Sequence, residues 1–231
     1  MNSTPDAGRR IRPALAGLIA LASMLVVLAI SGTHEGHAEG THHNAMAAKT
    51  QTTKQVVFHD AMRKLWEDHI TWTRLAIVSF AADLPDFDAT AARLLANQDD
   101  IGNAIKPYYG RAAGNALTKL LKEHILGAVT LMKAAKSGDN AAITQASADW
   151  YDNGNQIADL LHSANPHHWS RHAMRKMMKI HLDETLSEAQ HRLQGNYAAD
   201  VRDYDAVHHH ILEMADMLSA GIIHQFPRRF R

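Results

Sequence analysis

The stretch that decides the fold is Ala112–Lys136, with the sequence AAGNALTKLLKEHILGAVTLMKAAK. Its apolar residues recur every three or four positions, so Leu117, Leu121 and Leu131 fall on one face of a helix. Gly138 follows, and a glycine at this place favours the left-handed cap that ends many helices. The stretch therefore predicts a long helix with one buried face.

Four further stretches repeat this spacing and predict long helices. They cover about 54–82, 140–163, 171–193 and 197–224, with a short helix at 88–96 and a turn of helix at 99–105. Prolines or glycines interrupt the pattern at 84–85, 107–110, 165–166 and 195–196. Asp139 or Asn140, and Ser170, are the expected N-caps, because short polar side chains accept hydrogen bonds from the first free N–H groups.

Short connections between long amphipathic helices favour antiparallel neighbours. No alternating apolar run long enough for a strand is found in the sequence. We therefore expect an all-α fold, an up-and-down antiparallel helical bundle of four to five long helices. It forms one domain over 54–227, which is long enough for a single core.

The first 53 residues have a different composition. Arg9, Arg10 and Arg12 precede an apolar run at 14–30, the order of a secretory signal, so 1–31 is expected to be a signal peptide or an uncleaved N-terminal membrane anchor. Residues 32–53 are small and polar and predict a flexible linker. The linker contains the histidines 34, 37, 42 and 43, which can also capture divalent metals. The protein is expected to be exported, either periplasmic or secreted, and to meet a membrane only through this segment.

Composition excludes several functions. The 231 residues contain no cysteine, which rules out disulfides, thiolate metal sites and a cysteine nucleophile. The 24 basic and 24 acidic side chains balance, whereas a nucleic-acid binder usually has a basic excess. No phosphate loop, Gly-x-Ser-x-Gly or His-Glu-x-x-His motif is present, so binding is expected rather than turnover. The 17 histidines are the unusual feature.

Four of these histidines lie on predicted core-facing stripes, one on each of four long helices. They are His69, His124, His181 and His208. Burying several imidazoles costs free energy unless each finds a partner, and one shared metal ion would serve all four. Helical bundles commonly build such sites from facing helices.

Carboxylates near these histidines complete the predicted site. Asp205 lies three residues before His208 and Glu184 three residues after His181, and both spacings let the side chains meet on one helix face. Asp68 is a further candidate, as a hydrogen-bond partner of His69. Imidazole with carboxylate suits iron, copper, zinc or manganese, so the expected cofactor is a transition metal ion.

Three functions remain open from the residues. The leading hypothesis is an exported metal-binding protein for binding, storage or sensing. The first alternative is a structural or interaction module of the cell envelope, in which the histidines only form hydrogen bonds and the linker presents the bundle to a protein partner. The second is a haem or non-haem metal oxidoreductase, with haem held by histidine and a methionine.

Several strings also resemble a family of small bacterial all-helical proteins of unknown function. They include Leu65–His69 (LWEDH), Ile101–Gly110 (IGNAIKPYYG), Leu120–Ile125 (LLKEHI) and Met214–Met217 (MADM) with a following QFP. The resemblance spans most of 60–227 and implies the helical fold. Some members carry names such as acetylglutamate kinase or glycosyltransferase, but this chain lacks the phosphate-cradling loop that such chemistry uses.

Overall fold

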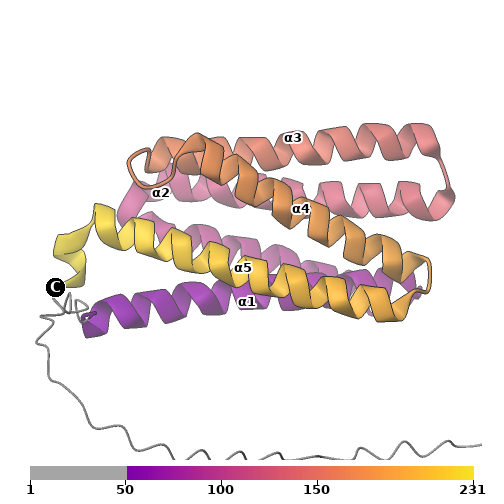
Figure 1. Cartoon of the computed structure of the whole chain (residues 1–231), viewed down its shortest axis with the longest axis horizontal. Coiled ribbons are helices and arrows are strands. Elements are labelled where there is room, and N and C mark those ends of the chain that lie inside the picture. The colour runs from indigo at the N-terminus through magenta and orange to yellow at the C-terminus, as the bar shows by residue number, and fades with distance from the viewer. Residues whose placement is uncertain (1–50) are drawn as a thin grey trace, which may run out of the picture. The chain divides into compact units, whose positions relative to one another are not determined.

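The computed structural model describes residues 51–231 (Figure 1). The predicted signal peptide or anchor at 1–31 and nearly all of the predicted linker at 32–53 lie outside the described residues. Within them, no helix has the length and apolarity needed to cross a bilayer.

The described residues form helices and no strand, which confirms the predicted all-α bundle. The helices are α1 (Thr53–Ala81), α2 (Phe87–Ser137), α3 (Asn140–Ala164), α4 (Arg171–Leu193) and α5 (Tyr197–Gln225), followed by a short 3-10 helix, η1 (Pro227–Phe230). The predicted caps are in place. Asp139 accepts hydrogen bonds from the backbone N–H groups of Ala141 and Ala142, and Ser170 accepts one from Ala173.

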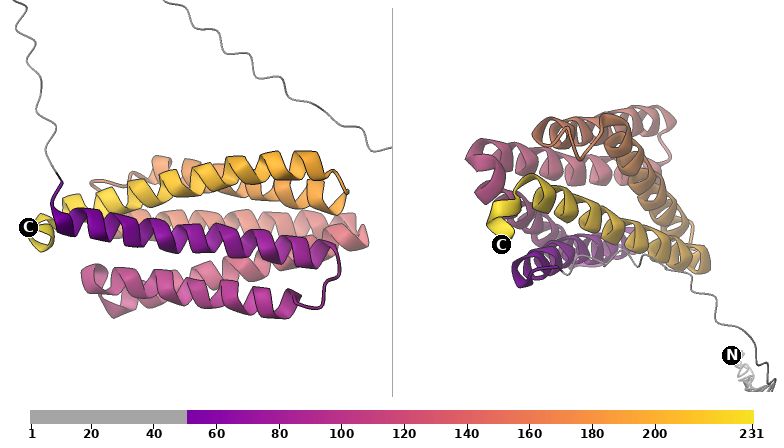
Figure 2. Two further views of the ribbon diagram at one scale, coloured as in Figure 1. Left: turned by 90° about the horizontal axis from the view of Figure 1, so that it is seen from below. Right: turned by 60° about the vertical axis from the view of Figure 1, so that its left-hand side comes forward.

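The α2 helix consists of two arms joined at Gly110. This residue has φ 83° and ψ 169°, a backbone conformation that residues with a Cβ rarely adopt. Figure 2 shows the two arms running in opposite directions. The predicted break at 107–110 is confirmed, but the predicted short helix and separate turn before it are wrong, because residues 87–109 form one continuous arm.

The two arms of α2 touch backbone to backbone. A Cβ placed on Gly102 would lie 2.7 Å from the carbonyl oxygen of Gly114, and one on Gly114 would lie 2.7 Å from the carbonyl oxygen of Gly102. Thr118 Oγ1 also donates to the carbonyl of Gln98 at 3.4 Å. The glycine pair therefore permits an approach that larger residues would block.

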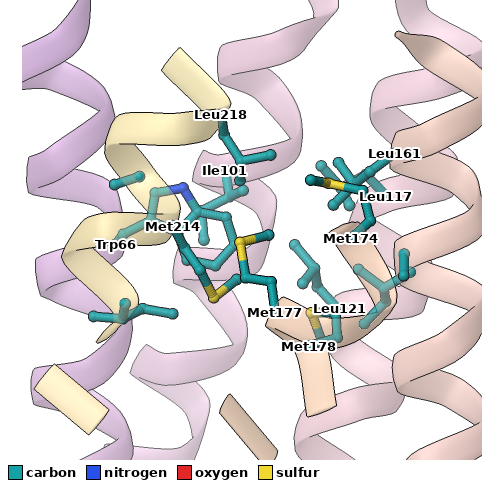
Figure 3. Close-up of a cluster of buried hydrophobic side chains, with 14 of the residues drawn as sticks. Trp66, Ile101, Leu117, Leu121, Leu161, Met174, Met177, Met178, Met214 and Leu218 are labelled. Carbon is teal, nitrogen blue, oxygen red and sulfur yellow. The ribbon is translucent and has the colours of Figure 1, made fainter. Parts of the chain in front are cut away.

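The helices enclose one main core. In Figure 1, α4 crosses the bundle obliquely, so that its N-terminal half lies beside α3 and its C-terminal half beside α5. Figure 3 shows Met177, Met178 and Met214 between Trp66 and Leu121 in this core. At the end of the bundle that holds the C-terminus, Phe58 and Tyr108 pack against Phe230.

Candidate metal centre

Three of the four predicted histidines converge in the core. His69 comes from α1, His124 from the second arm of α2 and His181 from α4, and each is at most 4% exposed. The ring centre of His181 lies 5.9 Å from that of His69 and 6.1 Å from that of His124. We call these three residues the histidine cluster.

Burial keeps the imidazoles of the cluster neutral. Loss of hydration lowers the pKa of His69 to about 3, with a further contribution from His124, and lowers the pKa of His124 to about 4. The pKa of His181 also falls well below its usual value, first through burial and then through His69 and His124. A neutral imidazole has a lone pair on one ring nitrogen, which is the form that binds metals.

The surroundings of His124 assign its tautomer. Asn153 Nδ2 donates to the carbonyl of Leu120 at 3.1 Å, so Asn153 Oδ1 faces Nδ1 of His124, also at 3.1 Å. Nδ1 must therefore be the N–H donor, and the lone pair lies on Nε2. The ring also stacks on Trp150, whose indole nitrogen donates to the carbonyl of His124 at 3.1 Å.

The partner of His69 is Gln98, on the first arm of α2. Gln98 Nε2 donates to the carbonyl of Leu94 at 2.8 Å, and its second N–H is shared between Asn97 Oδ1 and Nδ1 of His69, each at 3.2 Å. With this amide orientation Nδ1 accepts, and the proton of the neutral ring lies on Nε2. Binding of a metal at Nε2 of His69 therefore requires the other tautomer.

The lost hydration of the His181 ring is not replaced by a hydrogen bond of Nδ1 to any of residues 51–231. Its Nδ1 is buried and has no hydrogen-bond partner among the described residues. Burying a polar atom without a hydrogen-bond partner lowers the free energy of unfolding, and such atoms are uncommon in native structures. Among the described residues, Nδ1 of His69 and Nδ1 of His124 each face an amide, whereas Nδ1 of His181 has no partner.

The three rings line a cavity of about 30 Å³ in the centre of the bundle. Its other walls are apolar and include the thioether side chains of Met62, Met178 and Met214. No Asp or Glu of the described residues lines it. A volume of this size holds about one water molecule, and so also a bare metal ion, but not a porphyrin.

The fourth predicted histidine does not join the cluster. His208 lies at the edge of α5, where its Nε2 is 2.7 Å from Oε1 of Glu67 on α1. Its side chain is 31% exposed. The core face of α5 is formed by Val207, Ile211 and Met214 instead. The nearby Asp205 is exposed to solvent, away from the cavity.

The other two predicted carboxylates also lie elsewhere. Glu184 is half-buried, and burial raises its pKa. His210 lies near it. Neither residue lines the cavity. Asp68 accepts from Lys64 Nζ at 2.9 Å, and Gln98 occupies the position beside His69 that Asp68 was expected to take.

The three rings of the cluster lie slightly too far apart to bind one metal ion together. In residues 51–231, no three His, Asp or Glu side chains surround one point as metal ligands. Three imidazoles bound to one ion have ring centres about 5 Å apart, because each metal–nitrogen bond is about 2 Å long. The two separations that involve His181, 5.9 Å and 6.1 Å, exceed this by roughly 1 Å.

Sequence reasoning missed a buried ionic group near the α4–α5 turn. Arg74 Nη1 donates to Glu188 Oε1 at 2.9 Å and to Asp200, and Arg192 donates to the same aspartate at 3.4 Å. Glu188 and Asp200 are fully buried, and burial raises the pKa of Glu188 to about 7. This group joins α1, α4 and α5.

Sequence reasoning also missed the side-chain amides of Gln98 and Asn153, which orient the rings of His69 and His124. Gln98 lies between Leu94 and Ile101 on an apolar stripe, and Asn153 between Trp150 and Ile157 on another. A polar residue inside an apolar stripe was the available signal, the same signal that identified the histidines.

No protein-family model matches this chain, and comparisons with curated proteins and with solved structures find no similar protein. The interpretation of the cluster therefore rests on its geometry and chemistry.

Proposed function

We propose that the bundle binds one transition metal ion in its core through His69, His124 and His181, and that monovalent copper suits this site best. The observation that carries the proposal is the His181 ring. It is 3% exposed, lines the central cavity between two other neutral imidazoles, and has a buried Nδ1 without a partner among the described residues.

The charge of the site favours a monovalent ion. Among residues 51–231, the cavity wall provides three neutral imidazoles and no carboxylate. A divalent ion would bring two uncompensated positive charges into an apolar core, and burying unpaired charge is expensive. Cu(I) brings one.

The neighbouring atoms favour the same ion. Met62, Met178 and Met214 line the cavity with the histidines, and soft sulfur ligands select Cu(I) over harder ions such as Mn(II). A site of this kind, closed off in a helical core, suits metal binding, storage or sensing. Export of the protein and the metal-capturing role of the linker histidines remain predictions.

The test is a titration of the untagged full chain with Cu(I) under anaerobic conditions, with a chromophoric chelator as competitor. His34, His37, His42 and His43 are replaced by alanine in all samples, so that the linker cannot contribute. We expect one equivalent of copper per chain, and X-ray absorption should show nitrogen with at least one sulfur scatterer. Zn(II) should bind more weakly.

Two variants and one control locate the ion. His181→Leu and His124→Leu should each weaken binding at least about tenfold, since each removes a ligand. His181→Leu is the cleaner variant, because His124→Leu also removes the donor to Asn153 Oδ1. His208→Ala is the matched control and should bind as the parent does, because its ring pairs with Glu67 outside the cavity. Substoichiometric copper, or unchanged affinity in the His181→Leu chain, contradicts the proposal.

A further inference from the structure

A second and larger cavity lies between α1, α2, α3 and α4. Its volume is about 230 Å³. It is lined by residues near the α2–α3 and α4–α5 turns, at the end of the bundle away from the C-terminus (Figure 1). Trp150 separates it from the histidine cluster, since this indole lines the cavity and stacks on His124.

Two features account for this cavity: the oblique path of α4 and the small side chains that line it. Because α4 crosses obliquely, its C-terminal half moves from α3 toward α5 (Figure 1). The surfaces left facing one another present Ala76, Ala128, Ala135 and Ala189. These short side chains do not fill the gap, and atoms beside an empty volume lose their packing contacts.

The cavity wall is almost entirely apolar. Thr73 and Thr185 line it, but their hydroxyls donate to the carbonyls of His69 at 2.8 Å and His181 at 2.7 Å, so each offers mainly its methyl group. The lining residues include no charged side chain of the described chain. Ser147, half-buried, and Gln190, exposed, supply the polar groups nearest to solvent.

The volume sets the size of a ligand. A dry apolar cavity of about 150 Å³ in another protein accommodates benzene. In proportion, 230 Å³ corresponds to about nine carbon atoms. A charged group would lose its hydration in this cavity without gaining an ionic partner.

We propose that this cavity binds an uncharged, mostly hydrocarbon small molecule of about nine or ten carbons, with at most one hydroxyl or carbonyl directed to Ser147 and Gln190. This site is independent of the metal proposed above. The metal ligands lie beyond Trp150, and the ligand contacts no ring of the histidine cluster.

The experiment uses three probes that share one ring system: naphthalene, 1-naphthol and 1-naphthoate. Binding to the untagged full chain is measured by calorimetry in the presence of EDTA and a Cu(I) chelator, so that the chain is free of metal and the result does not depend on the proposed metal site. We expect naphthalene and 1-naphthol to bind and to raise the thermal midpoint. We expect 1-naphthoate to bind at least tenfold more weakly, because its carboxylate finds no counter-ion in the wall.

Filling the cavity provides the structural control. Ala76→Leu and Ala189→Leu should each reduce 1-naphthol affinity at least tenfold and leave the thermal midpoint of the free protein unchanged or higher. Ala61→Leu, at an exposed position of α1, should bind as the parent does. Methyl NMR of the parent should show contacts from 1-naphthol to Val129 and Ile143, which line the cavity.

Three results would overturn the proposal. The first is the absence of naphthalene and 1-naphthol binding to the parent chain. The second is binding that produces no contacts at Val129 and Ile143, and the third is equal affinity for 1-naphthoate and 1-naphthol. The NMR contacts are measured on the parent, so the outcome does not depend on whether the filled variants fold.

Discussion

Gln98 Nε2 donates to the carbonyl of Leu94 and lies 3.2 Å from Nδ1 of His69, while Gln98 Oε1 is buried without a partner among the described residues. The amide therefore favours the His69 tautomer with its proton on Nε2. A carboxylate at the same position would accept from Nδ1–H and leave the lone pair on Nε2, the arrangement found behind many metal-bound histidines.

Gln98→Glu is accordingly expected to act in opposite directions on the free and metal-bound protein. It should raise Cu(I) affinity by about tenfold, the lower end of what such partners contribute. It should also lower the unfolding free energy of the metal-free protein by about 1–3 kcal/mol, because a buried carboxyl group replaces an amide that bonds Leu94. Chelator competition and urea denaturation measure the two effects. Equal losses in both would contradict the assigned role of Gln98.

Glu188 provides a test of pH dependence away from the histidine cluster. Its pKa is about 7 in the folded protein, against 4.5 as the usual value, so the folded state binds more protons between these two pH values. The unfolding free energy therefore decreases as pH rises through this window and levels off above it. The change is about 2 kcal/mol between about pH 5 and pH 7.5.

Glu188→Gln should remove this contribution. The measured quantity is the difference in unfolding free energy between parent and variant at the two pH values, so that the titration of the histidines, which both proteins share, cancels. The parent should lose about 2 kcal/mol relative to the variant on going from about pH 5 to pH 7.5. A difference that is independent of pH would mean that Glu188 is ionised throughout, as an ordinary partner of Arg74.

At the scale of the element, α2 shows what periodicity can and cannot predict. The break at 107–110 followed from a proline and a glycine, whose effects on the backbone are local. The arm before it was predicted as two pieces, 88–96 and 99–105, on either side of Asn97 and Gln98. Both are fully buried, and they bond the carbonyls of Leu65 and Leu94. The bond from Asn97 to Leu65 is tertiary and the bond from Gln98 to Leu94 lies within the helix, and neither can be read from the apolar pattern.

Gly110→Ala should destabilise the hairpin between the two arms. At φ 83° and ψ 169° a Cβ is strained whatever space surrounds it, and no side chain lies within 4 Å of its position. The expected loss of unfolding free energy is about 1–3 kcal/mol. Gly138→Ala is the matched control and should cost less, since φ 70° and ψ 19° is a left-handed conformation that other residues adopt at smaller cost. Urea denaturation of the two variants measures both losses, and equal losses would contradict the argument.

At the scale of the whole molecule, the prediction that histidines on apolar stripes face the core was wrong for one of the four. His69, His124, His181 and His208 all lie on apolar stripes, yet the His208 ring turns toward Glu67 at the edge of the bundle. An apolar stripe covers roughly 100° or more of a helix, so its periodicity cannot distinguish the centre of the face from its margin. That distinction depends on how α5 is rotated against α1 and α4, which only the packed bundle defines.

The convergence of three helices on one cavity gives the last prediction, because a ligand held by α1, α2 and α4 together stabilises the whole fold. An ion that binds the folded state and not the unfolded chain adds about 4 kcal/mol at a free concentration a thousand times its dissociation constant. Cu(I) should therefore raise the thermal midpoint of the parent and of His208→Ala by similar amounts, and should raise that of His181→Leu by clearly less, because its site binds at least about tenfold more weakly. The metal-free His181→Leu protein should itself be at least as stable as the metal-free parent, because leucine relieves the buried Nδ1 that has no partner among the described residues. Calorimetric scans of the three chains with and without Cu(I) measure these shifts, and an equal rise in all three would place the copper outside the histidine cluster.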